Sequence, residues 1–221
     1  MIWRVRTTRV EIVICVLLLT MTIFNHRTTL AYGERIECTL YEAIRNDYVI
    51  ALIEGAYSGY EESFDLTNGY GVFYGPCISV WVSSLVDETL VITVKLGRYL
   101  IPDDYDVQNM MITKEYTFTL EAYENTTLTL YAMCIEMHDY VPSEGEFFDL
   151  GSLATGYLYD LVCEIEDNYA QDAAGQAAIW AITDHATEED LREMGADTYV
   201  LKRAQALLDD ADVPYLSLIH I

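Results

Sequence analysis

A stretch of ten residues, Gly175 to Asp184, limits what this chain can fold into more than any other part of it. The stretch holds helix formers and has no glycine or proline after its start. Gln176, Ile179, Trp180 and Thr183 fall at the i, i+3, i+4 and i+7 positions, which share one face of a helix. That face carries the bulky side chains, so we expect it to face the core. A buried amide without partners costs about 1–3 kcal/mol, so Gln176 is expected to have specific partners.

The residues from 35 to 134 predict strands. The last two expected strands alternate apolar and polar residues with a period of two, and Glu124-Asn125 is expected to join them as a hairpin. Several short strands at this spacing predict an immunoglobulin-like antiparallel β-sandwich. The clearest expected strands are Cys77–Val82, Thr89–Leu96, Gln108–Thr113, Tyr116–Ala122 and Thr126–Cys134.

Three earlier stretches are less definite. Cys38 to Arg45 and Tyr48 to Glu54 fit either two strands or one helix. Gly55 to Gly75 is rich in glycine and tyrosine and fits long loops with one hairpin.

After residue 134 the pattern becomes helical. His138 to Gly151 contains proline, glycine and four acids and is expected to be a loop, and a helical period begins at Leu153. Thr187 and Asp190 have the spacing of a helix-capping box, and Asp197 is expected to cap a last helix. The expected fold class is therefore α+β, with a β-sandwich over residues 35–134 and a loop plus small helical region over 135–215.

The first 31 residues predict a signal peptide. Three arginines precede an apolar run from Ile12 to Phe24, and Thr29-Leu30-Ala31 has small residues at the −3 and −1 positions of a cleavage site. The alternative is an uncleaved signal anchor. Both place the body of the protein outside the cytoplasm, secreted or attached to the cell surface.

The last six residues, 216–221, form an apolar tail after the final helix. This tail looks like the translation of a sequencing adapter, which would make it non-native and would mean that a C-terminal anchor is lost. The alternative is a short strand that pairs back onto the sheet. A membrane is therefore expected as a partner only through the signal or a lost anchor.

The formal net charge of −24 limits the partners. Nucleic acid and anionic lipid bind lysine and arginine, so neither is expected on the folded body. A strongly acidic surface fits a salty environment, where ions screen the repulsion, and fits plain solubility equally well.

Four cysteines follow the predicted signal peptide: Cys38, Cys77, Cys134 and Cys163. Outside the cell they are candidates for disulfides, with three pairings open. No Cys-x-x-Cys pair occurs, and no metal or other cofactor is expected. Acid pairs such as Asp103-Asp104 lie in expected loops and helix ends, so a hydrolase has no supporting set of residues.

Cys134 and Gln176 suggest one specific chemistry. If the helix packs against the end of the strand, the Cys134 thiol can attack the Gln176 amide and release ammonia, which gives an internal thioester. Such a bond is an electrophile that an amine or hydroxyl can open. His138 and His185 are the candidate proton shuttles. Trp180 and neighbouring apolar residues are expected to keep water out.

These residues resemble the thioester domains of bacterial surface adhesins. The resemblance covers Cys134 to Asp184: Met133-Cys134-Ile135 corresponds to the strand motif, and Gln176-Ala-Ala-Ile179-Trp180 to the helix motif. It implies a secreted or cell-surface adhesion module with Cys134 and Gln176 cross-linked. It also implies a ligand that bears an amine or hydroxyl, on a protein or a glycan, and stoichiometric self-modification rather than turnover.

The alternative is a non-reactive, disulfide-stabilised envelope or interaction domain. In that case Cys134 pairs with another cysteine. Gln176 is then a core amide that bonds the backbone of the loop around Pro142, and Trp180 is ordinary core.

Overall fold

The computed structural model describes residues 35–56 and 74–214. The predicted signal peptide, the tail over 216–221 and most of Gly55 to Gly75 lie outside these residues. From Ile36 onward the described residues belong to one compact unit.

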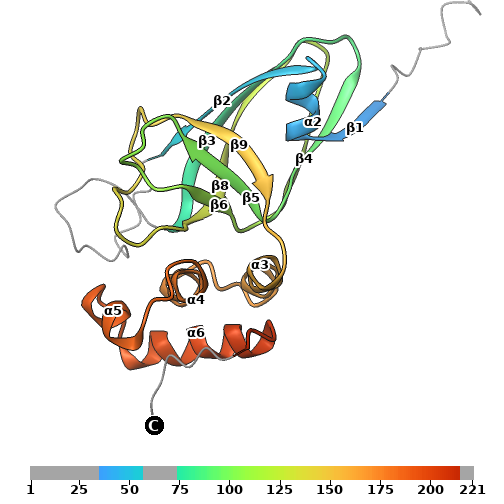
Figure 1. Cartoon of the computed structure of the whole chain (residues 1–221). Coiled ribbons are helices and arrows are strands. Elements are labelled where there is room, and N and C mark those ends of the chain that lie inside the picture. Colours follow the sequence, from blue (N-terminus) through green and yellow to red (C-terminus); the bar gives the residue numbers. More distant parts are fainter. Residues whose placement is uncertain (1–34, 57–73, 215–221) are drawn as a thin grey trace, which may run out of the picture. The chain divides into compact units, whose positions relative to one another are not determined.

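Two largely antiparallel sheets and several helices confirm the α+β class (Figure 1). One sheet has three strands in the order β1-β4-β7, and the other has six in the order β2-β3-β8-β6-β5-β9. The strands are β1 Arg35–Thr39, β2 Val49–Gly55, β3 Tyr74–Ser84, β4 Thr89–Val94, β5 Arg98–Pro102, β6 Met110–Ile112, β7 Tyr116–Leu120, β8 Asn125–Cys134 and β9 Phe148–Leu153. The helices are α2 Leu40–Arg45, α3 Tyr157–Asp167, α4 Ala173–Thr183, α5 Glu188–Glu193 and α6 Thr198–Asp210.

The strand alternation seen in the sequence matches the burial of side chains. In β4, every second residue is buried, which is the pattern of a strand with one face on the core. In β8 the alternation holds up to Leu130, and the last three residues, Ala132 to Cys134, are all buried. The end of β8 is therefore covered on both faces, and α4 contacts it there.

The predicted hairpin at Glu124-Asn125 is wrong. β7 pairs with β4 in the three-stranded sheet, whereas β8 pairs with β3 and β6 in the other sheet. A short connection does join β7 and β8, but it leads from one sheet to the other. Alternation shows which face of a strand is apolar and does not identify its neighbour.

The expected loop from His138 to Gly151 contains most of β9, which pairs with β5. Both strands are short and include Pro102 or Gly151, residues that weaken a strand signal. The stretch Cys38 to Arg45 is also divided, because β1 ends at Thr39 and α2 follows. Thr39 and Glu42 form a capping box there, a signal that the sequence contains.

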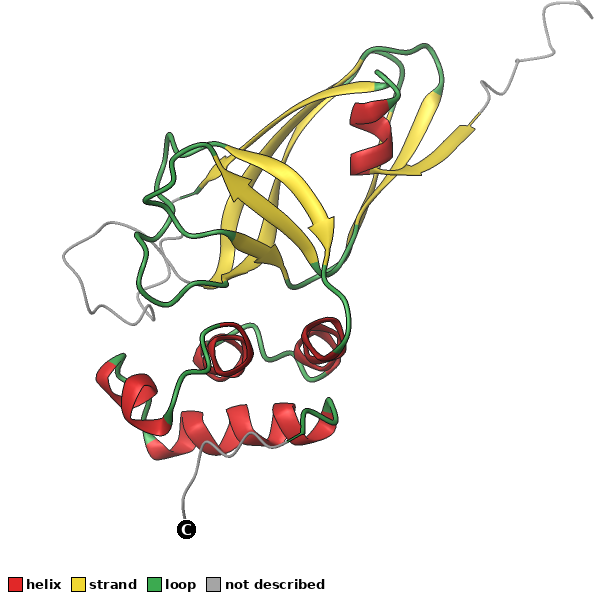
Figure 2. Cartoon of the chain, in the orientation of Figure 1, coloured by secondary structure: helices red, strands yellow, loops and turns green. Residues whose placement is uncertain are grey.

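Three of the helices drawn in red in Figure 2, α4, α5 and α6, begin directly after a capping residue. Asp172 caps α4, Thr187 and Asp190 form the predicted capping box of α5, and Asp197 caps α6 as predicted. Eight of the eleven residues of α4 are buried, so this helix is apolar on nearly all sides and needs neighbours all round. It packs against α6 and α3 and against β8.

Candidate functional site

Cys134 is the last residue of β8, and its backbone N–H and C=O groups do not pair with β6. Ile135 donates its N–H to the Asn109 carbonyl (3.1 Å), which makes Met110 and Cys134 a non-hydrogen-bonded pair. The N–H and C=O of Cys134 therefore point away from β6, toward the β3 side. The pairing of β3 with β8 begins one residue earlier, at Tyr74 and Met133. Among the described residues, no strand residue lies opposite Cys134 on that side.

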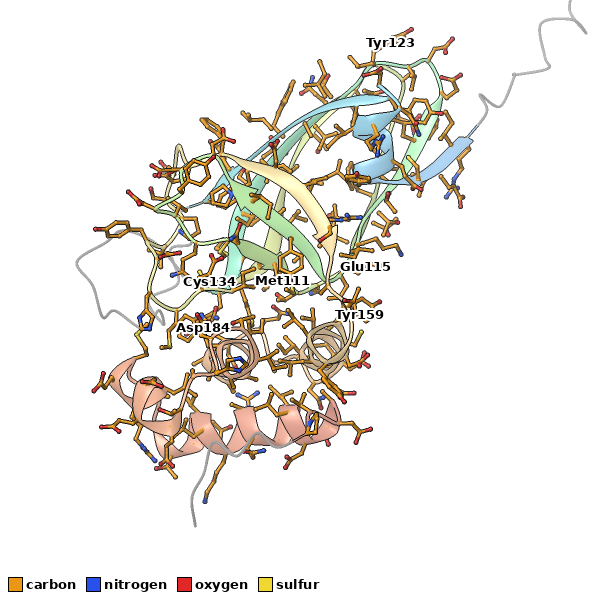
Figure 3. All side chains as sticks on the ribbon, viewed as in Figure 1. Met111, Glu115, Tyr123, Cys134, Tyr159 and Asp184 are labelled. Atoms are coloured by element: carbon orange, nitrogen blue, oxygen red, sulfur yellow. The ribbon has the colours of Figure 1, made fainter. Side chains whose placement is uncertain are left out.

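The side-chain amide of Gln176 fills this position. Its Oε1 accepts the Cys134 N–H at 3.1 Å, and its Nε2 donates to the Cys134 carbonyl at 2.8 Å. Neither residue has any exposed surface. The amide thus bonds both backbone groups of Cys134 in the way a neighbouring strand would, and its carbonyl carbon lies beside the backbone of Cys134. Cys134 is labelled in Figure 3, at the end of the sheet that faces the helices.

Gly175 allows α4 to come this close. A Cβ at this position would lie 2.2 Å from the Ala170 carbonyl oxygen and 2.9 Å from Cε of Met133. Real side chains do not tolerate such distances, so only glycine fits between the turn before α4 and the underside of β8. The start of α4 is further fixed by its Asp172 cap, whose side chain accepts the Ala174 N–H at 2.9 Å.

The Cys134 thiol is buried and neutral. Its Sγ lies 3.2 Å from Sδ of Met110, as expected for side chains of a non-hydrogen-bonded pair. Burial raises the pKa of Cys134 well above its usual range, and the neighbouring groups of Cys77 and Glu136 raise it further. Burial likewise raises the pKa of Cys77 to about 12. Attack by Cys134 would therefore have to proceed from the thiol, which loses its proton as the new bond forms.

The predicted shuttles, His138 and His185, are exposed. They lie one residue beyond Met137 and Asp184, whose contact joins the chain after β8 to the end of α4. Hydrogen bonds from Thr187 lower the pKa of Asp190, and His138 nearby lowers it further. No hydrogen bond joins either imidazole to Cys134 or Gln176 within the described part of the chain. The structure brings Cys134 and Gln176 together and places the histidines at the surface.

Two polar residues near Cys134 were not singled out from the sequence. Glu136 accepts the N–H of Asn109 at 2.6 Å and its side-chain amide at 2.5 Å, which fixes the chain just after β8. Asp184 accepts the Met137 N–H at 3.2 Å. For Asp184, the signal available in the sequence was its place at the C-terminal end of a helix, where a negative charge is unfavourable.

The four described cysteines, Cys38, Cys77, Cys134 and Cys163, are all free thiols. Gln176 bonds the backbone of Cys134 rather than the loop around Pro142. Ile179 and Trp180 are buried on the same face of α4 as Gln176.

No cluster in the described ranges 35–56 and 74–214 gathers three or more His, Cys, Asp or Glu side chains that could hold a metal ion. In the acidic run after β5, Asp104 accepts the backbone N–H of Asp106 at 3.0 Å, which is a local turn contact. Within the same residues, no helix has the length and apolar character needed to cross a membrane.

A scan against protein-family models gives no match, and searches of curated proteins and of solved structures give none either. The contact between Cys134 and Gln176 is therefore the feature of the chain that indicates a function.

Proposed function

We propose that this chain is a secreted or cell-surface adhesion module that forms an internal thioester between Cys134 and Gln176 and uses it for covalent attachment. One observation carries the proposal: the only buried glutamine amide of α4 is hydrogen-bonded on both sides to the backbone of the cysteine that would attack it. Holding the two residues side by side lowers the entropic cost of bringing the thiol and the amide together.

Thioester formation uses only groups of this site. The Cys134 sulfur attacks the carbonyl carbon of Gln176, and the Cys134 N–H that already donates to Oε1 stabilises the negative charge that develops there. The thiol proton passes to Nε2, the carbon–nitrogen bond breaks, and ammonia leaves. One carbon–sulfur bond replaces one carbon–nitrogen bond.

In the attachment step the ligand is the nucleophile and the Cys134 sulfur is the leaving group. An amine of the ligand attacks the same carbonyl carbon, the carbon–sulfur bond breaks, and the amine proton passes to the Cys134 sulfur. The product is an amide bond between the ligand and residue 176; a hydroxyl would give an ester in the same way. Buried Ile179 and Trp180 limit access of water to the bond. His138 and His185 are proposed to carry protons between this site and solvent.

The proposal extends to architecture and location. We propose that the two antiparallel sheets form an immunoglobulin-like sandwich, supported by their division into two sheets and a continuous buried core. Export is supported by the pattern of the first 31 residues, and the acidic charge disfavours nucleic acid as a partner. The ligand is a protein or glycan that presents an amine or hydroxyl.

A second candidate function has an observation in its favour. Both polar atoms of the Gln176 amide have a hydrogen-bond partner, so the amide is stable in the core without any reaction. A non-reactive envelope or interaction domain would need nothing more, with disulfides added where pairs of cysteines allow them.

Incubation with methylamine separates the two functions. A thioester predicts N-methylglutamine at position 176 and a newly free Cys134 thiol in the peptide map, and predicts neither in Cys134→Ala. Unmodified Gln176 in the wild type, with Cys134 recovered in a disulfide-linked peptide under non-reducing digestion, would support the second function and rule out the first.

A further inference from the structure

The chain after β8 is attached to α4 at a second point. Oδ1 of Asp184 accepts the backbone N–H of Met137 at 3.2 Å, and Oδ2 accepts the hydroxyl of Thr183 at 2.7 Å. Asp184 is half-buried and directly follows α4. Figure 3 labels Asp184 and Cys134 at the boundary between the sheet and the helices.

The two attachment points join the same two segments at different places. The Gln176 amide contacts Cys134, the last residue of β8, and Asp184 contacts Met137, three residues further on in a chain that bends at Ile135 and Met137. From Gln176 to Asp184, eight residues of helix span about 12 Å. The two segments are therefore fastened at one point by the Gln176 amide and at another by Asp184. A slip of one residue would shift the strand by about 3.3 Å and remove Cys134 from the amide.

The charge of Asp184 is not explained by the helix. A carboxylate at a helix C-terminus opposes the macrodipole, and α4 has no basic residue in its last turn to compensate. The N–H of Met137 is the contact that offsets this placement. Because asparagine can accept the same N–H without a charge, the contact and the charge can be tested separately.

We propose that Asp184 is a positioning residue for the bond between Cys134 and Gln176: by holding Met137, it fixes the register of β8 against α4. This inference rests on the proposed function, since it concerns the same reaction. Asp184 acts through the backbone of the Cys134 segment and does not touch the reacting atoms.

The test uses the reversibility of the reaction. Concentrated ammonium returns a thioester to the Gln176 amide and the Cys134 thiol, and removal of ammonium lets the bond form again with loss of about 17 Da. The rate of that loss is followed by intact mass in the wild type, Asp184→Ala and Asp184→Asn. Asp210→Ala is the matched control, because it removes an acid at the end of α6, away from this site.

We expect Asp184→Ala to re-form the bond at least about 10-fold more slowly, because displacements near 1 Å in such sites cost rates of that order or more. Asp184→Asn is expected within about 3-fold of the wild type, and Asp210→Ala is expected to match it. Urea curves run in parallel show that each variant is folded at the assay temperature. Rescue by asparagine in folded protein is a result that a general loss of stability would not produce.

The outcomes separate the two proposals. If the wild type never loses the 17 Da, the thioester fails and the inference falls with it. If the wild type forms the bond and Asp184→Ala forms it equally fast, the positioning role is overturned while the proposed function stands. If Asp184→Asn is as slow as Asp184→Ala, the charge and not the accepted N–H is what matters, and the positioning role is likewise overturned.

Discussion

Replacing Gln176 by methionine tests the most specific contact in the structure. Methionine keeps most of the volume of the side chain but can neither accept the N–H nor donate to the carbonyl of residue 134. The experiment is best done in a Cys134→Ala background, where no thioester can form and the backbone groups of residue 134 are unchanged. The measurement then concerns the non-covalent pairing alone.

The size of the effect follows from the two hydrogen bonds. Each buried backbone group left without a partner costs about 1–3 kcal/mol. Two such groups would cost about 2–6 kcal/mol, and local relaxation of the end of β8 favours the lower part, about 2–4 kcal/mol. With a urea slope of about 2 kcal/mol per molar, the unfolding midpoint should fall by about 1–2 M.

Urea unfolding at 25 °C, followed by tryptophan fluorescence, measures this shift. Gln205→Met in the same background is the control, because Gln205 lies on α6 and bonds Asp209 at the surface. It should change the free energy of unfolding by less than about 0.5 kcal/mol. A fall in the midpoint of less than about 0.3 M for Gln176→Met would show that the amide does not bond the backbone of residue 134.

Three further predictions concern the same region and its supports. Gly175→Ala should lower the free energy of unfolding in urea by about 1–3 kcal/mol, because the new Cβ would overlap the Ala170 carbonyl oxygen. An increase of about 1 kcal/mol, the usual benefit of alanine over glycine in a helix, would mean that α4 does not pack against β8 as described. Iodoacetamide at about pH 8 should label the half-buried thiols of Cys38 and Cys163 before those of Cys77 and Cys134. The reason is that burial raises the pKa of Cys77 and Cys134 most strongly. Peptide mapping that finds Cys134 labelled first would contradict this. Hydrogen bonds from Thr187 hold the pKa of Asp190 below its ordinary value of 3.8. They therefore stabilise the folded state above pH 3.8, and this stabilisation is lost as the pH falls through the lower pKa of the folded state. Thr187→Ala should make the fall in stability with acid less steep in this range, and an unchanged pH profile would refute the role of the cap.

The helix that carries the site was predictable because its signal is local. The spacing of Gln176, Ile179 and Trp180 fixes which residues share a face, and an amide on an apolar face needs partners wherever that face packs. The caps at Thr187 and Asp197 are equally local, since a cap is defined within four residues. These features held in the structure.

Strand pairing and other contacts between residues far apart in the sequence were not predictable in the same way. β7 and β8 are adjacent in sequence but lie in different sheets, and β9 joins β5 after a gap of about fifty residues. The sequence also suggested that the amide would meet the thiol, whereas its hydrogen bonds go to the backbone of Cys134. Whether a residue close in sequence, such as His138, turns toward a site depends on the path of the chain after the strand, which no local pattern contains.

Intact mass of the purified wild type, read beside Cys134→Ala and Gln176→Ala, tests the central claim most directly. Loss of ammonia predicts a wild type about 17 Da lighter than the mass calculated from its sequence, with both variants at their calculated masses. A wild type at its full calculated mass, with Cys134 and Gln176 intact, would contradict the thioester and leave the paired amide as a structural contact.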